Sequence, residues 1–96
     1  MMHLRYIEDD MHGWIGFPEI LLDAYDIKPS SFSYRDPAGV WVDGAGREYL
    51  GMVWLEEDCD APRLIAALDR ANVPYEITEQ YQRGESPIRN LERWKP

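Results

Sequence analysis

The stretch LEEDCDAPRLIAALDRANVPYEI, residues 55–77, decides the fold because it reads as strand, helix and strand in succession. Asp60 stands where a helix N-cap is expected, and Pro62 falls in the first turn, which tolerates proline. Asn72 is suited to the left-handed residue that follows a helix, and Pro74 forbids continuation. Between these signals, apolar residues recur at helical spacing and form one stripe: Leu64, Ile65, Leu68 and Ala71.

The segments on either side of this helix predict strands of different kinds. Tyr75–Tyr81 alternates apolar and polar residues, which indicates a strand with one wet face. Glu48–Leu55 is apolar on both faces, so it is either a central strand or a strand that faces a partner. It forms a predicted hairpin with Val40–Val42, because the intervening DGAGR supplies glycines for the turn.

The N-terminal part predicts a strand, a loop and a second helix. His3–Ile7 is short and rich in residues that favour strands. Met11–Phe17 is expected to be a loop because Gly13 and Gly16 interrupt it. Pro18–Tyr25 is expected to be a helix that begins at its proline, although no good N-cap residue precedes it.

The resulting order βαββαβ is that of an α+β, ferredoxin-like antiparallel sheet with two helices on one face. Its other face then needs a cover, either the C-terminal tail or another chain. An alternative fold has two helices and a three-stranded meander built from Phe32–Tyr34, Val40–Val42 and Tyr49–Leu55. We expect one acidic domain over residues 1–82 and a basic tail over residues 83–96, in which Pro87–Trp94 could form a short docked helix.

The bulk properties exclude several classes of protein. Ninety-six residues make one domain, and no apolar run approaches the roughly 18 residues of a membrane span. The N-terminus lacks the basic and apolar parts of a signal peptide. A single cysteine cannot cross-link the chain, so a reducing, cytoplasmic setting is expected.

The charge is the feature most informative about partners. Eighteen acids against ten bases give a net charge of −8. The charge is uneven: residues 1–82 carry sixteen acids and six bases, whereas residues 83–96 carry two acids and four bases. Such a field repels nucleic acid and anionic membranes and attracts basic surfaces. Tryptophan is a preferred interface anchor, and Trp14 is expected in a loop beside acids. The predicted partner-binding residues are Glu8, Asp9, Asp10, Trp14, Glu19, Asp23, Asp26, Glu56, Glu57 and Asp58.

Catalytic, cofactor and metal motifs are missing from the sequence. Cys59 precedes a helix, which favours a reactive thiolate, but its acidic neighbours oppose one. His3 and His12 with the nearby acids match no known metal-binding loop. We therefore predict no catalytic residue, no cofactor and no metal, and we interpret Cys59 as incidental.

Three functions follow as hypotheses. The first is a non-enzymatic acidic inhibitor or nucleic-acid mimic that occupies a basic site on a nucleic-acid-binding protein, as a phage-encoded anti-CRISPR protein would. In a ferredoxin-like sheet, however, the acids after the first and third strands would leave at opposite ends. The second is a small enzyme or ligand-binding domain, dimeric across the open sheet face, whose candidate polar groups are His3, Arg5, Tyr6 and Glu79. The third is a self-associating accessory subunit.

Overall fold

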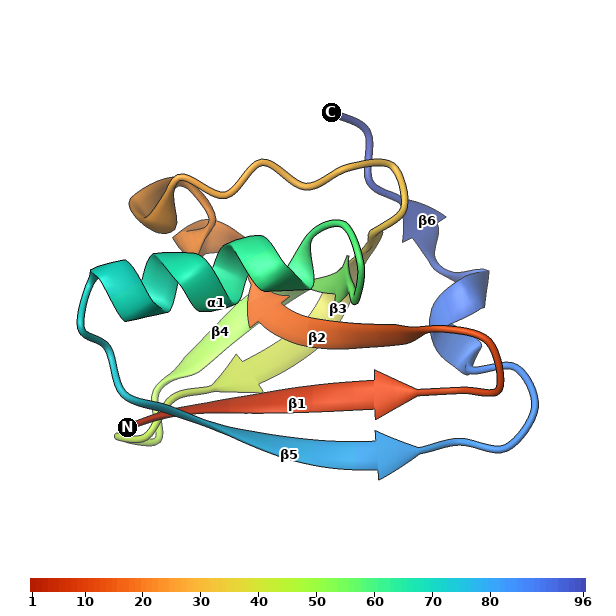
Figure 1. The fold of residues 1–96 in the computed structure, drawn as a ribbon, viewed down its shortest axis with the longest axis horizontal. Helices are drawn as coiled ribbons and strands as arrows, with labels where there is room; N and C mark the ends of the chain where they lie inside the picture. The colour runs from red at the N-terminus through yellow and green to blue at the C-terminus, as the bar shows by residue number, and fades with distance from the viewer.

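The computed structural model describes all residues 1–96 as a small α+β fold with one six-stranded mixed sheet (Figure 1). The strand order is β5-β1-β2-β4-β3-β6, and all pairs are antiparallel except β1 with β5. The elements are β1 (Met2–Glu8), β2 (Gly13–Pro18), the 3-10 helices η1 (Glu19–Leu21) and η2 (Asp23–Tyr25), β3 (Tyr34–Val42), β4 (Glu48–Glu56), α1 (Ala61–Arg70), β5 (Tyr75–Tyr81), the 3-10 helix η3 (Pro87–Asn90) and β6 (Glu92–Arg93).

The sequence prediction was right about the strand–helix–strand unit and the hairpin. β4 is central, between β2 and β3, as its two apolar faces indicated. The helix α1 ends before Asn72, whose φ of 56° is left-handed as expected. Asp60 occupies the N-cap position, but its carboxylate accepts hydrogen bonds from Ser30 and Ser33 instead of from the helix. It therefore fastens the preceding loop to the start of α1.

The ferredoxin-like strand order was wrong because the predicted loop over Met11–Phe17 contains strand β2. Gly13 and Gly16 are strand residues here, and each makes room for an aromatic ring from a neighbouring strand. A Cβ atom on Gly16 would lie 2.7 Å from the Trp54 ring, and one on Gly13 would overlap the Tyr6 ring. Glycine in a strand often marks a place where another group packs closely, and the prediction instead took both glycines as signs of a loop.

The predicted helix over Pro18–Tyr25 was right only in part. The segment forms two short 3-10 helices instead of one continuous helix, and it ends at Asp26 in the left-handed conformation, with φ of 54°. No side chain caps either turn. An uncapped segment of eight residues gains too little from helix propagation to offset nucleation, so burial of Leu22 and Ile27 sets its path instead.

The predicted meander was wrong in a different way, because Phe32–Tyr34 and Val40–Val42 do not form two strands. Tyr34–Val42 is one strand, β3, and both its halves pair with β4 on either side of an irregularity between Asp36 and Val40. Phe32 lies outside this strand and is exposed.

The two faces of the sheet are covered by different parts of the chain. On one face, which we call the helix face, α1 and the 3-10 turns cover the buried side chains (Figure 1). The register places the following buried side chains on this face: Leu4, Ile15, Phe17, Val53 and Leu55.

Part of the opposite face, which we call the tail face, is covered by residues 82–94. Ile88 and Leu91 of the tail border Ile7 and Trp54, and the Arg89 guanidinium lies 5.4 Å from the centre of the Trp14 ring. The expected short helix over Pro87–Trp94 is present only as η3, capped by Ser86, and is followed by the two residues of β6. The tail, one of the two covers predicted, therefore covers part of the open face, and His3 and Arg5 on the same face remain exposed.

None of the helices is both long enough and apolar enough to span a membrane.

Candidate functional site

Strand β2 brings the two acidic runs of the sequence together. Because β2 is antiparallel to both β1 and β4, β1 and β4 run in the same direction, and their C-terminal ends lie at the same end of the sheet. Glu8 is the last residue of β1 and Asp10 follows it there, and Glu57 and Asp58 follow β4. The expectation that these runs leave at opposite ends was therefore wrong, because it rested on the strand order without β2.

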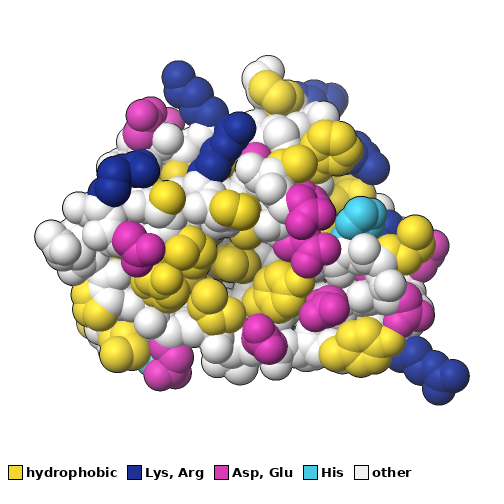
Figure 2. All heavy atoms as spheres, viewed as in Figure 1, with side chains coloured by type: hydrophobic (Ala, Val, Ile, Leu, Met, Phe, Trp, Pro, Cys, Tyr) yellow, Lys and Arg dark blue, Asp and Glu magenta, His cyan; other side chains and the backbone are white.

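We call this surface the acidic end. It consists of Glu8, Asp10, Glu57, Asp58 and Glu79, whereas the neighbouring Glu56 is buried. Glu79 joins it because β5 is parallel to β1 and places Glu79 beside Tyr6. In Figure 2, acidic side chains, hydrophobic rings and one histidine alternate across this side of the molecule.

Two tyrosines hold carboxylates of the acidic end in place. The Tyr6 hydroxyl donates to Glu57 Oε2 at 2.6 Å, and the Tyr81 hydroxyl donates to Asp10. Desolvation and the hydrogen bond to Glu57 raise the pKa of Tyr6 far above its ordinary value, and Glu8 and Glu79 add to the effect. The hydrogen bond to Asp10 likewise raises the pKa of Tyr81. Both phenols therefore stay protonated and act as donors.

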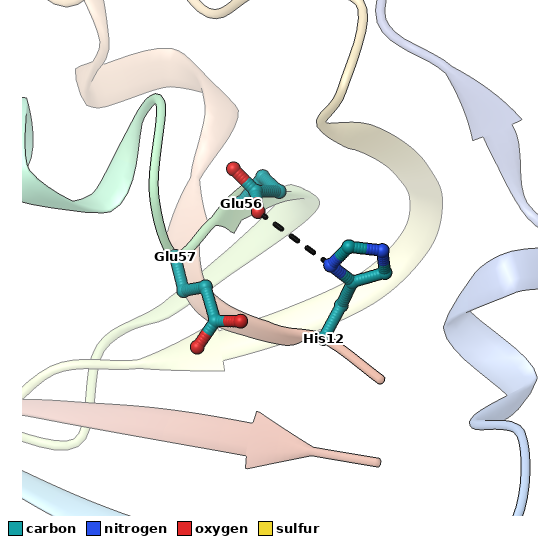
Figure 3. A group of neighbouring side chains, drawn as sticks. All are labelled: His12, Glu56 and Glu57. Atoms are coloured by element: carbon teal, nitrogen blue, oxygen red, sulfur yellow. Dashed lines mark ion pairs between the residues drawn. The ribbon is translucent and has the colours of Figure 1, made fainter. Parts of the chain in front are cut away.

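His12, Glu56 and Glu57 form the group closest to a metal-ligand set (Figure 3). Their ligand atoms lie within 4.8 Å of one another, and His12 Nδ1 is 3.9 Å from Glu56 Oε1. Glu56 Oε2 already accepts hydrogen bonds from the backbone N–H groups of Asp58 and Cys59, and Glu57 Oε2 accepts from Tyr6. Of this group, the His12 side chain is exposed, whereas the Glu56 side chain is buried and its Oε1 atom faces His12.

Cys59 is exposed at the margin of the acidic end. Desolvation of the sulfur, and after it the Glu56 carboxylate, raise the pKa of the Cys59 thiol. Asp58 and Asp60 act in the same direction. The setting therefore opposes the thiolate, as the acidic neighbours in the sequence indicated.

Three of the predicted partner-binding residues, Asp9, Trp14 and Glu56, are buried instead. Trp14 is 1% exposed, and it packs edge-on against Tyr34 at a centroid distance of 6.1 Å. Asp9 is 3% exposed, and its carboxylate forms a bidentate ion pair with Arg89, in which Nε donates to Oδ2 at 2.6 Å and Nη2 donates to Oδ1 at 3.1 Å. Neither Trp14 nor Asp9 can reach a partner without unfolding of the tail. The predicted loop at Met11–Phe17 made Trp14 look accessible, whereas the strand directs it into the tail face.

The remaining predicted acids lie apart from the acidic end. Glu19 belongs to η1, where it pairs with Arg35 at 3.1 Å. Asp23 and Asp26 follow in and after η2, at the end of the sheet opposite the β1–β2 turn (Figure 1). The sequence reasoning also missed Glu79, Tyr6 and Tyr81 as parts of the acidic surface, and only the parallel β1–β5 pairing shows that they belong to it.

The polar groups considered for an enzyme do not converge. Tyr6 and Glu79 point to the helix face, whereas His3 and Arg5 occupy alternate positions of β1 and point to the tail face. Two hollows of similar size, about 520 and 510 Å³, lie on the surface; none of the four groups lines the first, and of the four only His3 lines the second. Neither hollow therefore brings the proposed acid–base groups together.

Comparisons with protein-family models, with curated proteins and with solved structures found no match to this chain.

Proposed function

We propose that this chain is a non-enzymatic binding protein whose acidic end occupies a basic, nucleic-acid-binding site on a partner protein. The observation that carries the proposal is the convergence of carboxylates from three separate segments, residues 8–10, 57–58 and 79, around Tyr6 and Tyr81. In the partner complex, these carboxylates take the place of nucleic-acid phosphates. The protein would act in the cytoplasm, where such partners are abundant.

The chemistry of the acidic end suits arginine and lysine side chains. Carboxylates form short, charge-assisted hydrogen bonds with guanidinium groups, as phosphates do. The tyrosine rings between them offer faces on which a guanidinium can stack. A surface that alternates acids with aromatic rings therefore meets both requirements of an arginine-rich site.

The tyrosine hydroxyls also reduce the cost of binding. Tyr6 and Tyr81 fix one oxygen of Glu57 and of Asp10, so two of the carboxylates are already oriented in the free protein. Side chains that are ordered before binding lose less conformational entropy when the partner arrives.

The proposal is tested with two variants of equal charge change. The double variant Glu8→Lys with Asp58→Lys alters two exposed residues of the acidic end. Asp23→Lys with Asp69→Lys alters two exposed residues at the other end of the molecule. The structure gives none of these four side chains a hydrogen bond or ion pair, so both variants are expected to fold. Each changes the formal net charge of −8 by the same amount.

Wild-type protein and both variants are immobilised and exposed to a heparin-binding fraction of a cell extract. We expect wild type and the Asp23/Asp69 variant to retain a protein whose nucleic-acid binding the free chain then blocks. The Glu8/Asp58 variant should neither retain it nor compete with nucleic acid, and raised salt should weaken the interaction. Equal loss in both variants would show that only net charge matters, and would contradict a site at the acidic end.

A further inference from the structure

The outer edge of β5 is a long unpaired strand edge. β5 is the terminal strand of the sheet (Figure 1), and six of its seven residues are exposed. Protein strand edges are usually shortened, bulged, covered or protected by proline or by charged side chains, lysine above all. Tyr75–Tyr81 has no proline or lysine, its only charged residues are Glu76 and Glu79, and it pairs with β1 without a bulge over its whole length. At the other end of the sheet, β6 has only two residues.

The hydrogen bonds at the two ends of the β1–β5 pair identify the free backbone groups. Met2 N–H donates to Pro74 O at 2.9 Å, and Gln82 N–H donates to Glu8 O at 2.7 Å. Hydrogen bonds in a parallel pair alternate along each strand, so residues 74, 76, 78, 80 and 82 face β1. The N–H and C=O groups that point away from the sheet therefore belong to Tyr75, Ile77, Glu79 and Tyr81.

We propose that β5 pairs antiparallel with β5 of a second copy of this chain, about a two-fold axis at Thr78. This register overlaps all seven residues of the strand and uses every outward N–H and C=O group. It places Tyr75 opposite Tyr81 of the second copy, Ile77 opposite Glu79, and Thr78 opposite Thr78. The proposal does not depend on the proposed function, because it is argued from the backbone groups and the pairing of β5, although β5 also carries Glu79 and Tyr81 of the acidic surface.

The strand is complementary to itself in charge and in apolar character. Directly opposed like charges destabilise a sheet, and this register has none, because Glu76 meets Gln80 and Glu79 meets Ile77. A shift of the axis by one residue in the C-terminal direction would place Glu79 opposite Glu79. The proposed register also pairs an aromatic ring with an aromatic ring at both ends, and it covers Ile77 and Tyr81, which are 38% and 62% exposed in the single chain.

The neighbouring strand adds a polar contact on the tail face. Arg5 donates to the Gln80 side-chain oxygen at 3.3 Å, which leaves the Gln80 amide N–H groups free. In the proposed pair, that amide faces Glu76 of the second copy and can donate to its carboxylate. Each copy supplies both partners, so the contact forms twice and the assembly closes as a dimer.

A cysteine scan tests the register directly. Thr78 and its symmetry mate would form a non-hydrogen-bonded pair with Cα atoms about 4.5 Å apart, which a disulfide can span. In a Cys59→Ser background, Thr78→Cys should therefore give a disulfide-linked dimer on mild oxidation. Glu76→Cys is the matched control, because the two introduced sulfurs would be displaced by roughly 13 Å along the strands. Linkage of the control as readily as of Thr78→Cys would overturn the register.

Association is measured by analytical ultracentrifugation or light scattering, with far-UV circular dichroism to confirm folding of each variant. We expect a mass twice the 11.2 kDa of the chain, and stronger association at high salt because both copies are acidic. Ile77→Glu should weaken association about tenfold or more, since it opposes Glu79, and Glu79→Lys in the same chain should restore it. A monomer at every concentration and salt, or failure of the second substitution to restore pairing, would overturn the proposal.

Discussion

Of the single substitutions of acidic residues in this protein, Asp9→Asn should be among those that most reduce the free energy of unfolding. The Asp9 carboxylate is buried and accepts five hydrogen bonds: from the N–H groups of Met11, His12 and Ser86, and two from Arg89. These bonds fasten the tail over Trp14 and hold the pKa of Asp9 far below its ordinary value.

The magnitude follows from the groups that lose a partner. An asparagine amide has one oxygen, so its nitrogen must face donors in either orientation: Met11, His12 and Arg89 Nη2 on one side, or Ser86 and Arg89 Nε on the other. The substitution also leaves the Arg89 guanidinium, which is partly buried, without its counter-charge. Removal of one member of a buried pair typically costs about 3–5 kcal/mol, against a total stability of about 5–15 kcal/mol for a domain.

The assay is urea unfolding followed by tryptophan fluorescence, for Asp9→Asn and for Asp10→Asn as a control. Asp10 is the adjacent acid, but its hydrogen bonds to Tyr81 and Gly84 are exposed, so its loss should cost about 1 kcal/mol or less. A cost below about 1 kcal/mol for Asp9→Asn, or equal costs for the two variants, would refute the account of how the tail is held.

The pH dependence gives a second reading of the same contact. Because the folded pKa of Asp9 is lowered, its contribution to stability is complete above the unfolded pKa of about 3.9 and is lost as pH falls toward the folded value. The difference in unfolding free energy between wild type and Asp9→Asn should therefore shrink from about pH 5 downward. Parallel pH curves for the two proteins would contradict this assignment.

Two further substitutions test the packing and the acidic end. Gly16→Val should lower the free energy of unfolding by about 1–3 kcal/mol in urea, because the added Cβ atom would lie 2.6 Å from the Met52 side chain and 2.7 Å from the Trp54 ring. An unchanged free energy of unfolding would show that the β2–β4 packing is looser than described. In an ultraviolet pH titration of the tyrosines, Tyr6→Phe should remove the phenol that ionises at the highest pH, because desolvation and Glu57 raise the pKa of Tyr6. An unchanged alkaline end of the titration would mean that this last ionisation belongs to another tyrosine.

The sequence was sufficient for those elements whose signals are local. The apolar stripe of α1, the left-handed Asn72 and the two-sided apolar character of β4 depend on residues that are close in sequence. Their predicted positions were accordingly confirmed within a residue or two.

The errors came from residues whose role is set by distant partners. Gly13 and Gly16 are required by the rings of Tyr6 and Trp54, one of which lies almost forty residues away along the chain. Without that contact, the local pattern indicates a loop, and the loss of β2 changed the predicted strand order and the ends at which the acids leave the sheet.

The same limit applied to the candidate site. The count of acids selected Glu8, Asp10, Glu57 and Asp58, which are exposed or partly exposed, but it did not predict that they lie together at one end of the sheet. It could not separate them from Asp9, because only the tertiary contact with Arg89 makes that carboxylate structural. It also could not include Glu79, which joins the group through the parallel pairing of β5 with β1.

The central claim is that the acidic end is the surface that receives a basic partner, and one measurement tests it without knowledge of that partner. The isotope-labelled chain is titrated with an arginine-rich peptide, and backbone amide shifts are followed by NMR at moderate salt. We expect the largest shifts at residues 8–12, 56–59 and 79–81, and small shifts around Asp23 and Asp26. Shifts of equal size around η1 and η2, or shifts spread evenly over the molecule, would contradict the claim.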